Sequence, residues 1–338
     1  MANWFDRFSG PDLLVGMASE TKTVLEQKLG IPSGQPLGMA SHGVGFDIAY
    51  LQVNEDHALG ASCIQLMSLR PLAGNEPLDE DGRVVRNMLL AYITSQRMDR
   101  PIVAHVHALS APTQDDINTI IEMLRSRGIP HMSRINNVFF GLIEGEDGRI
   151  RYDPTVDAGL FLEFAPTYSE AYPNFIAPPR LPEHPLVGEV PPGTMVRLTA
   201  RTQLVRSADS VIDRLRFMLD WPEEEHLDVR EGEGYRSVSI KPMNGLSAVW
   251  ELIEPTDPRG RAGQVLERYG EGPWTIRIGV FGLDEKLADL DARGTGWTSI
   301  DDGPNGRRVA LNRWHLRGVP IELEDMPVVY RGEGGKRL

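Results

Sequence analysis

The 338-residue chain carries 48 acidic and 35 basic residues, which gives a formal net charge of -13 at pH 7. A surface this negative repels a phosphate backbone and no local basic stripe offsets it, so we expect no nucleic-acid partner. No apolar run approaches the roughly 20 residues that span a bilayer, and the single cysteine, Cys63, excludes an intramolecular disulfide, so we expect a cytoplasmic protein without a membrane partner.

At this length the chain has room for two domains, each with its own core. The apolar pattern of the first third predicts, in chain order, a strand over 12–18, a helix over 20–29, strands over 44–53 and 61–69, and a helix over 84–96. In the strand over 61–69, Cys63 and Gln65 share one face, whereas Ile64 and Leu66 share the other. Asp47 interrupts the preceding apolar strand, so its side chain faces either solvent or a substrate.

The stretch over 101–166 contains the residues that point to chemistry. It reads as a strand over 102–109 with His105 and His107 on one face, a helix over 115–127, an inner strand over 137–142 and a closing strand over 160–164. In the closing strand Glu163 points away from its apolar neighbours. Burying such a carboxylate costs several kcal/mol unless it is paired or bound to a metal. Two imidazoles and one carboxylate on two strands therefore predict half of a divalent-metal site.

Prolines mark the expected boundary between the two domains. They recur throughout 169–194 and break helices and central strands alike, which predicts an extended linker. We expect a first domain over 1–168, a second domain over 195–330 and a disordered tail over 331–338.

After the linker the pattern begins again. It predicts a strand over 196–205, a helix over 210–219, a solvated acidic loop over 223–226, strands over 236–240, 246–253 and 274–280, a helix over 284–293, and strands over 308–312 and 319–323. Four closing strands each place one polar residue between apolar neighbours: Gln65, Glu163, Glu251 and Glu322. Each opening strand precedes that residue by roughly 50 residues, which indicates one supersecondary unit present in four copies.

Four βαβββ units, with a polar residue near the first strand and a glutamate in the last, resemble the vicinal oxygen chelate superfamily of glyoxalases, bleomycin-resistance proteins and extradiol dioxygenases. The resemblance is carried locally by the phrase from Tyr152-Asp153-Pro154 to Glu163 and by the segments over 274–280 and 321–323. It implies an α+β fold in which four βαβββ modules pair into two cup-shaped mixed-sheet domains. It also implies one divalent metal ion at the base of a cup, held by the first and last strand of each unit.

Carried onto this sequence, the resemblance gives His105, Glu163 and Gln65 as metal ligands in the first domain. The opening strand of the first unit offers only Asp12 or Leu13, so no fourth ligand is assigned. Imidazole and carboxylate ligands suit zinc, iron, nickel and manganese to differing degrees, so the metal stays open. The structural alternative for Gln65 is a buried amide that satisfies backbone groups.

His107 is expected either to act as the catalytic base or to hydrogen-bond the substrate, because His105 takes the ligand position. Asp47 and Cys63 are the expected substrate contacts. In the second domain, Glu251 and Glu322 lie near an arginine, which suits an ion-paired core better than a metal site. We therefore expect the second domain to be degenerate and free of metal, and we expect no cofactor beyond one divalent ion.

The implied function is that of a metal-dependent enzyme acting on a small oxygenated organic substrate. Its chemistry would be proton transfer of the isomerase or lyase type through a metal-stabilised enolate or oxyanion. Two alternatives stay open: an extradiol-type ring-cleaving dioxygenase, and a non-catalytic small-molecule-binding or drug-resistance protein. Either the two domains complete each other's sheets or a homodimer does so.

Overall fold

The structure is a computed structural model that describes residues 7–8, 12–31, 46–54, 63–69, 80–96, 103–111, 113–134, 137–166, 190–242, 245–301 and 307–329. Most of the expected linker, 169–189, and the expected tail, 331–338, lie outside the described residues.

The first half of the chain forms a mixed eight-stranded sheet with three helices. The strands run in the order β3-β4-β2-β5-β10-β7-β6, and β1 pairs with β5. These strands are β1 (Arg7–Phe8), β2 (Asp12–Leu14), β3 (Phe46–Gln52), β4 (Cys63–Leu69), β5 (Val103–Ala111), β6 (His131–Arg134), β7 (Asn137–Phe140) and β10 (Leu162–Pro166). A separate hairpin is made by β8 (Leu142–Glu144) and β9 (Ile150–Tyr152), and the helices are α1 (Ala18–Leu29), α2 (Glu80–Ser95) and α3 (Gln114–Ser126).

The second half forms a second eight-stranded sheet in the order β12-β13-β14-β11-β15-β18-β17-β16. Its strands are β11 (Thr194–Leu204), β12 (Leu227–Gly232), β13 (Tyr235–Ile240), β14 (Val249–Pro255), β15 (Gly272–Phe281), β16 (Trp297–Asp301), β17 (Arg308–Leu311) and β18 (Ile321–Asp325). Its helices are α4 (Ala208–Leu219), α5 (Arg261–Tyr269) and α6 (Leu283–Ala292), with short 3-10 turns η3 (Glu224–His226) and η4 (Arg313–Leu316).

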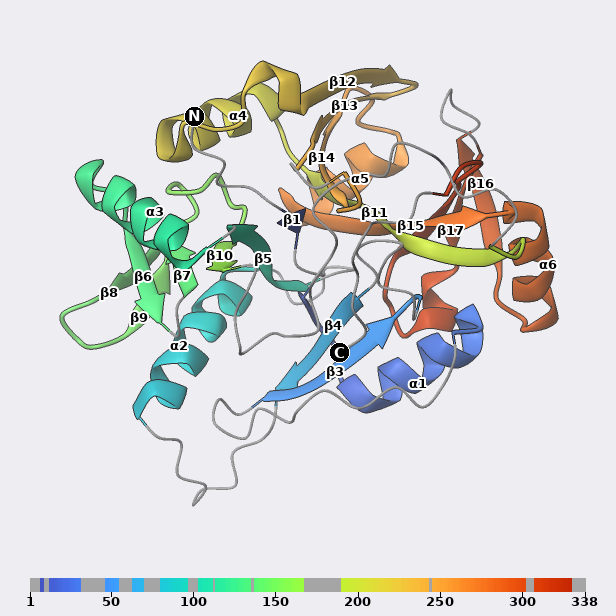
Figure 1. The fold of residues 1–338 in the computed structure, drawn as a ribbon, viewed down its shortest axis with the longest axis horizontal. Helices are drawn as coiled ribbons and strands as arrows, with labels where there is room; N and C mark the ends of the chain where they lie inside the picture. The colour runs from blue at the N-terminus through green and yellow to red at the C-terminus, as the bar shows by residue number, and fades with distance from the viewer. Residues whose placement is uncertain are drawn as a thin grey trace.

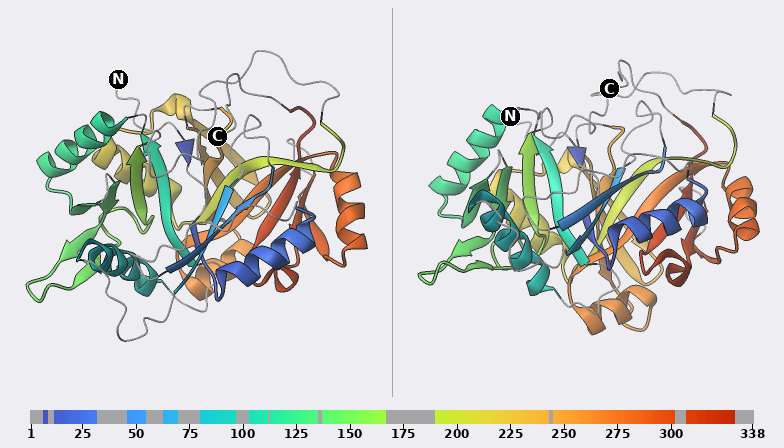
Figure 2. Two further views of the ribbon diagram at one scale, coloured as in Figure 1. Left: turned by 60° about the horizontal axis from the view of Figure 1, so that its bottom comes forward. Right: turned by 90° about the horizontal axis from the view of Figure 1, so that it is seen from below.

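Both sheets repeat one topological feature. Each opening strand lies parallel to the strand that closes its segment, in the pairs β2/β4, β5/β10, β11/β14 and β15/β18, while the remaining pairs of long strands are antiparallel. The sheets are twisted and curled, with helices beside them (Figures 1 and 2). The α+β class expected from the sequence is therefore confirmed.

Local sequence signals explain where the helices begin and end. Helix α3 starts at a capping box, in which Thr113 accepts a hydrogen bond from the backbone of Asp116 and the Asp116 carboxylate accepts one in return from Thr113. Helix α1 ends at Gly30, whose φ of 67° is the left-handed conformation that glycine adopts without strain. The predicted end of this helix is confirmed, and its start lies two residues earlier, at Ala18 rather than at residue 20.

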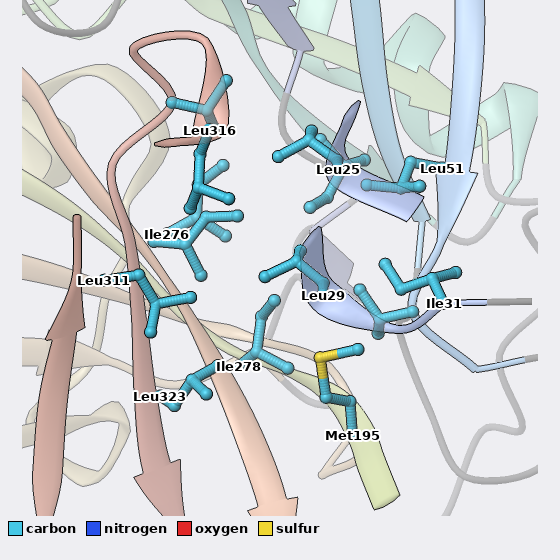
Figure 3. Close-up of a cluster of buried hydrophobic side chains, with 14 of the residues drawn as sticks. Leu25, Leu29, Ile31, Leu51, Met195, Ile276, Ile278, Leu311, Leu316 and Leu323 are labelled. Atoms are coloured by element: carbon cyan, nitrogen blue, oxygen red, sulfur yellow. The ribbon is translucent and has the colours of Figure 1, made fainter. Parts of the chain in front are cut away.

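The two largest hydrophobic clusters combine residues from both halves of the chain. One cluster joins α3, β5, β7 and β10 to α4, β13 and β14, and the other joins α1, β3 and β4 to β15, β17, β18 and α6. Figure 3 shows the second cluster, in which Leu25, Leu29, Ile31 and Leu51 face Met195, Ile276, Ile278, Leu311, Leu316 and Leu323. Apolar faces of one half are therefore buried against the other, in addition to the clusters that each half forms by itself.

Helix α5 and the strands β1, β6, β9, β12 and β16 were not predicted from the sequence. The acidic run at 223–226, expected as a loop, contains the short turn η3 and leads directly into β12.

Candidate functional site

The first candidate ligand, Glu163, is buried on one face of the first sheet. It lies in β10 and is 8% exposed. The amide Nδ2 of Asn137 donates a hydrogen bond of 2.5 Å to its Oε1 atom. Glu163 is in register with Phe139, which packs in a cluster with Tyr92 and Phe161. The sequence reading was right that a carboxylate is buried here among apolar side chains.

Gln65 and Cys63 lie on the same face of the sheet, in β4. Their neighbours Ile64 and Leu66 belong to the cluster between the two halves, whereas Met67 packs in the cluster that contains Phe139. Because side chains alternate along a strand, Cys63, Gln65 and Met67 share the face of Glu163. Gln65 Nε2 donates to Met67 Sδ at 3.1 Å, so the side chain is held within the sheet face.

Strand β5 runs between these two, and for His105 and His107 the structure describes the backbone position only. The register pairs Glu163 with Ala108 and Leu162 with His107. Residues paired in register lie on the same face of a sheet. The position of His107 is therefore that of Leu162, one residue out of step with Glu163.

His105 occupies an irregular position. Asp12 pairs with Val106 and Leu13 with Ala104, so β5 contains one residue more than β2 at this point, and that residue is His105. Such bulges turn a side chain away from the regular alternation and are frequent beside active sites. On the other side of β2, Asp12 is in register with Gln65. Four adjacent strands, β4, β2, β5 and β10, thus bring the positions of Gln65, Asp12, His105 and Glu163 to one region of the sheet.

Asp47 does not lie on this face. It is exposed, and it alternates with Phe46 and Ile48, which pack in the cluster around Tyr92. Its own face is that of Ala49 and Leu51, which belong to the cluster between the halves. Asp47, an expected substrate contact, therefore lies on the sheet face opposite to Glu163 and Gln65.

A buried polar network adjoins Glu163 and was not recognised from the sequence. The Asp157 carboxylate is fully buried, accepts a hydrogen bond from the Tyr152 hydroxyl, and accepts another of 3.0 Å from the backbone N–H of Leu162. The Tyr92 hydroxyl donates to the carbonyls of Phe140 and Leu162, at 2.6 and 3.2 Å. Both backbone groups of Leu162, its N–H and its carbonyl, are therefore hydrogen-bonded just before Glu163.

Burial also changes the acidities in this network. It raises the pKa of the Asp157 carboxyl to about 6, although hydrogen bonds from Tyr152 and from nearby backbone N–H groups oppose the rise. The pKa of Tyr92 is raised by burial and, to a lesser degree, by the charges of Asp157 and Glu163. The pKa of Tyr152 is likewise raised, by burial first and then by the adjacent carboxylate.

In the second half, an arginine lies between the two glutamates expected from the sequence. Arg277 of β15 is 7% exposed; its Nη2 lies 2.5 Å from Oε2 of Glu251 and its Nε lies 3.8 Å from Oε2 of Glu322. Burial lowers the pKa of Arg277, but the charges of Glu251, Glu324 and Glu322 outweigh it, so the net pKa is raised and the side chain stays charged. Arg261 adds a contact of 3.5 Å to Glu322. A guanidinium thus occupies the space between these carboxylates.

Among the side chains that the structure describes, no three of histidine, cysteine, aspartate and glutamate gather closely enough to hold a metal. The side chains of His105 and Asp12 are not in that set. No helix in the described ranges is both long and apolar enough to cross a bilayer.

No protein-family model matches the chain, and no curated protein sequence matches it. Among solved structures, a triple mutant of 4-hydroxymandelate synthase from Streptomyces coelicolor aligns over 98% of this chain and 94% of its own, with a TM-score of 0.52 at 14% identity. A methylmalonyl-CoA epimerase variant from Streptomyces coelicolor aligns over 39% of this chain and 97% of its own, with a TM-score of 0.34 at 23% identity. The epimerase from Mycobacterium tuberculosis aligns over 42% and 93%, with a TM-score of 0.34 at 21% identity.

The synthase alignment spans both sheets, and the fold assignment depends on it. In this chain the two sheets are mixed, and each has parallel pairs of opening and closing strands. The chain therefore has a fold like that of 4-hydroxymandelate synthase over nearly its whole length.

Proposed function

We propose that the chain is a metal-dependent enzyme that holds one divalent ion in the first sheet through His105, Gln65 and Glu163. The single observation that carries the proposal is the placement of Glu163, a carboxylate that is 8% exposed on the face that also holds Gln65. Strand β5, which lies between β4 and β10, contains one residue more than β2 at His105. As part of this proposal we interpret the chain as four βαβββ units; in the first of them the described residues contain two strands after the helix.

The residue types suit a divalent ion. Imidazole nitrogen, carboxylate oxygen and amide oxygen are ordinary ligands of zinc, iron, nickel and manganese. A carboxylate in a poorly solvated site attracts a cation more strongly than one in water. Asn137 fixes the orientation of Glu163 through its hydrogen bond, as residues behind a metal ligand commonly do. Asp12, in register with Gln65, is the nearest further position on the opening strand.

When bound, the ion would supply Lewis-acid stabilisation of an enolate or oxyanion on a substrate with two neighbouring oxygens. The residues of the chain then hold that ion and keep water away from it. Glu163 and Gln65 emerge from a face on which Phe46, Met67 and Phe161 are packed, and this apolar lining excludes solvent. The proposal assigns no base to His107, because its register position is that of Leu162.

The experiment that tests this function follows proton exchange directly. The protein, loaded in turn with zinc, manganese, nickel and iron, is incubated in deuterated water with small 2-oxo acids, hydroxyketones and thioesters. Loss of the NMR signal from the proton beside the carbonyl is expected with the wild type and not with Glu163→Gln. Asp47→Asn is the matched control, because Asp47 is an exposed carboxylate on the opposite face.

No exchange with any metal or substrate class would contradict the enzymatic proposal. In that case, metal-independent binding of a small molecule by the wild type would support the alternative of a binding protein.

A further inference from the structure

A cavity of about 520 Å³ lies where the two halves of the chain meet. From the first half it is lined by the C-terminal end of α2 and the loop that follows β9. From the second half it is lined by the turn between β11 and α4 and the turn between α5 and β15. Its volume is within the range of small-molecule sites. None of the candidate metal ligands lines it, although Phe161, which packs on the face of Glu163, also lines this cavity.

The floor of the cavity is apolar and rigidly held. The rings of Tyr152 and Phe161 lie 4.8 Å apart between centroids, and Val211 closes the floor at 3% exposure. The Tyr152 hydroxyl is held by the buried Asp157 carboxylate. Phe161 has a φ of 53°, a left-handed conformation that is strained for a bulky side chain and that the surrounding packing must maintain. The ring surface is thus formed before any ligand arrives.

The residues that line the cavity include one positive and one negative side chain, those of Arg206 and Glu271. The backbone N–H of Arg206 donates a hydrogen bond of 2.7 Å to Oε1 of Glu271, so the guanidinium and the carboxylate are borne on adjoining chain segments. Both residues are exposed. Within the described part of the chain, the Arg206 side chain forms neither an ion pair nor a hydrogen bond.

The start of α4 does not offer a competing anion site. The backbone N–H of Ser210 already donates to the Ser207 hydroxyl at 3.2 Å, and that of Ala208 donates to the Glu254 carboxylate at 3.0 Å. Among the described residues that line the cavity, Arg206 carries the cationic side chain, and the planar pair of N–H donors on its guanidinium matches a carboxylate.

We infer that this cavity binds a small zwitterion, an α-amino acid with an apolar side chain. Its carboxylate pairs with Arg206, its ammonium group with Glu271, and its side chain lies on the rings of Tyr152 and Phe161. The inference does not depend on the proposed metal chemistry.

Isothermal titration calorimetry of the full chain tests this site with three related probes. L-phenylalanine carries both charges, 3-phenylpropionate lacks the ammonium group and 2-phenylethylamine lacks the carboxylate. L-phenylalanine is expected to bind at least about tenfold more tightly than either of the other two, because each charge pair contributes. Arg206→Gln is expected to lower the affinity for L-phenylalanine about tenfold and to leave the affinity for 2-phenylethylamine unchanged. Glu271→Gln is expected to lower the affinity for L-phenylalanine similarly and to leave the affinity for 3-phenylpropionate unchanged.

Two further variants separate the site from general effects on the protein. Arg149→Gln, which removes an arginine that is 80% exposed on the β8–β9 hairpin, is the matched control and is expected to bind as the wild type does. Ser210→Trp places an indole at the exposed wall of the cavity and is expected to abolish binding without lowering the melting temperature.

Three results would each overturn the inference. They are no heat of binding from L-phenylalanine or L-leucine up to about 10 mM, equal affinity for L-phenylalanine and 3-phenylpropionate, and wild-type affinity in Arg206→Gln.

Discussion

The buried carboxyl of Asp157 should make the stability of the protein depend on pH in an unusual direction. Its pKa is raised from 3.8 to about 6 by burial. Between about pH 4 and pH 6 the folded protein therefore binds a proton at this position that the unfolded chain has already released. The free energy of unfolding contributed by Asp157 must fall as the pH rises through this window.

The size of the effect follows from the same values. A rise in pKa from 3.8 to about 6, at about 1.4 kcal/mol for each pKa unit, corresponds to about 3 kcal/mol. Asp157→Asn removes the titration. The difference in unfolding free energy between wild type and variant should therefore shrink by most of this amount from pH 4 to pH 7. The difference isolates Asp157, because carboxylates with lowered pKa, such as Asp153, Asp228 and Asp289, are present in both proteins.

The assay is urea unfolding followed by tryptophan fluorescence at pH 4, 5, 6 and 7, on the wild type and the variant in parallel. Loss of the hydrogen bond that Asp157 accepts from Leu162 shifts the variant by a constant amount and does not affect the slope with pH. A difference that is flat with pH would refute the raised pKa. A difference that grows with pH would show that the carboxylate is stabilised by a positive partner.

Arg277→Met should lower the free energy of unfolding by about 3–5 kcal/mol, because it leaves Glu251 and Glu322 buried without this cation. Adding Glu251→Gln should recover part of the loss, and urea unfolding of the single and double variants measures both effects. An unfolding free energy that Arg277→Met leaves unchanged would contradict this prediction. Leu29→Ala should cost about 2–5 kcal/mol, since Leu29 is fully buried in a cluster that includes Ile276 of the other half. Differential scanning calorimetry should show one transition shifted as a whole, whereas two transitions of which only one moves would exclude a shared core.

The parts of the fold that sequence predicted well are those fixed by local chemistry. Helix α1 ends at Gly30 because the chain there needs a positive φ, and a glycine followed closely by proline signals that need. Glu163 was recognised because a lone carboxylate between apolar strand residues must be buried or paired.

Helix α5 was missed for a local reason that the structure explains. Gly263 lies in its first turn, where a Cβ atom would come within 2.4 Å of the Asp257 carbonyl oxygen. The close approach of the backbone requires glycine, and glycine weakens the helical pattern in the sequence.

The registers and the shared cores depend on contacts far apart in the chain. A slip of one residue moves a strand's side chains to the other face, so the irregularity at His105 changes which positions of β5 accompany Glu163. Nothing local to Leu29 says that it shares a core with Ile276 of the other half as well as with Leu51 of its own sheet. The buried Asp157 was missed because its partners are a tyrosine and backbone groups, which leave no charge pattern in the sequence.

The most direct test of the account is the metal content of protein purified without a histidine tag, measured by mass spectrometry. The wild type and Asp47→Ala are expected to carry close to one divalent ion per chain, and His105→Ala and Glu163→Ala to lose it, with calorimetric melting showing that all four are folded. Wild type that carries no metal and takes up none on incubation, or folded His105→Ala and Glu163→Ala that keep it, would contradict a metal site in the first sheet.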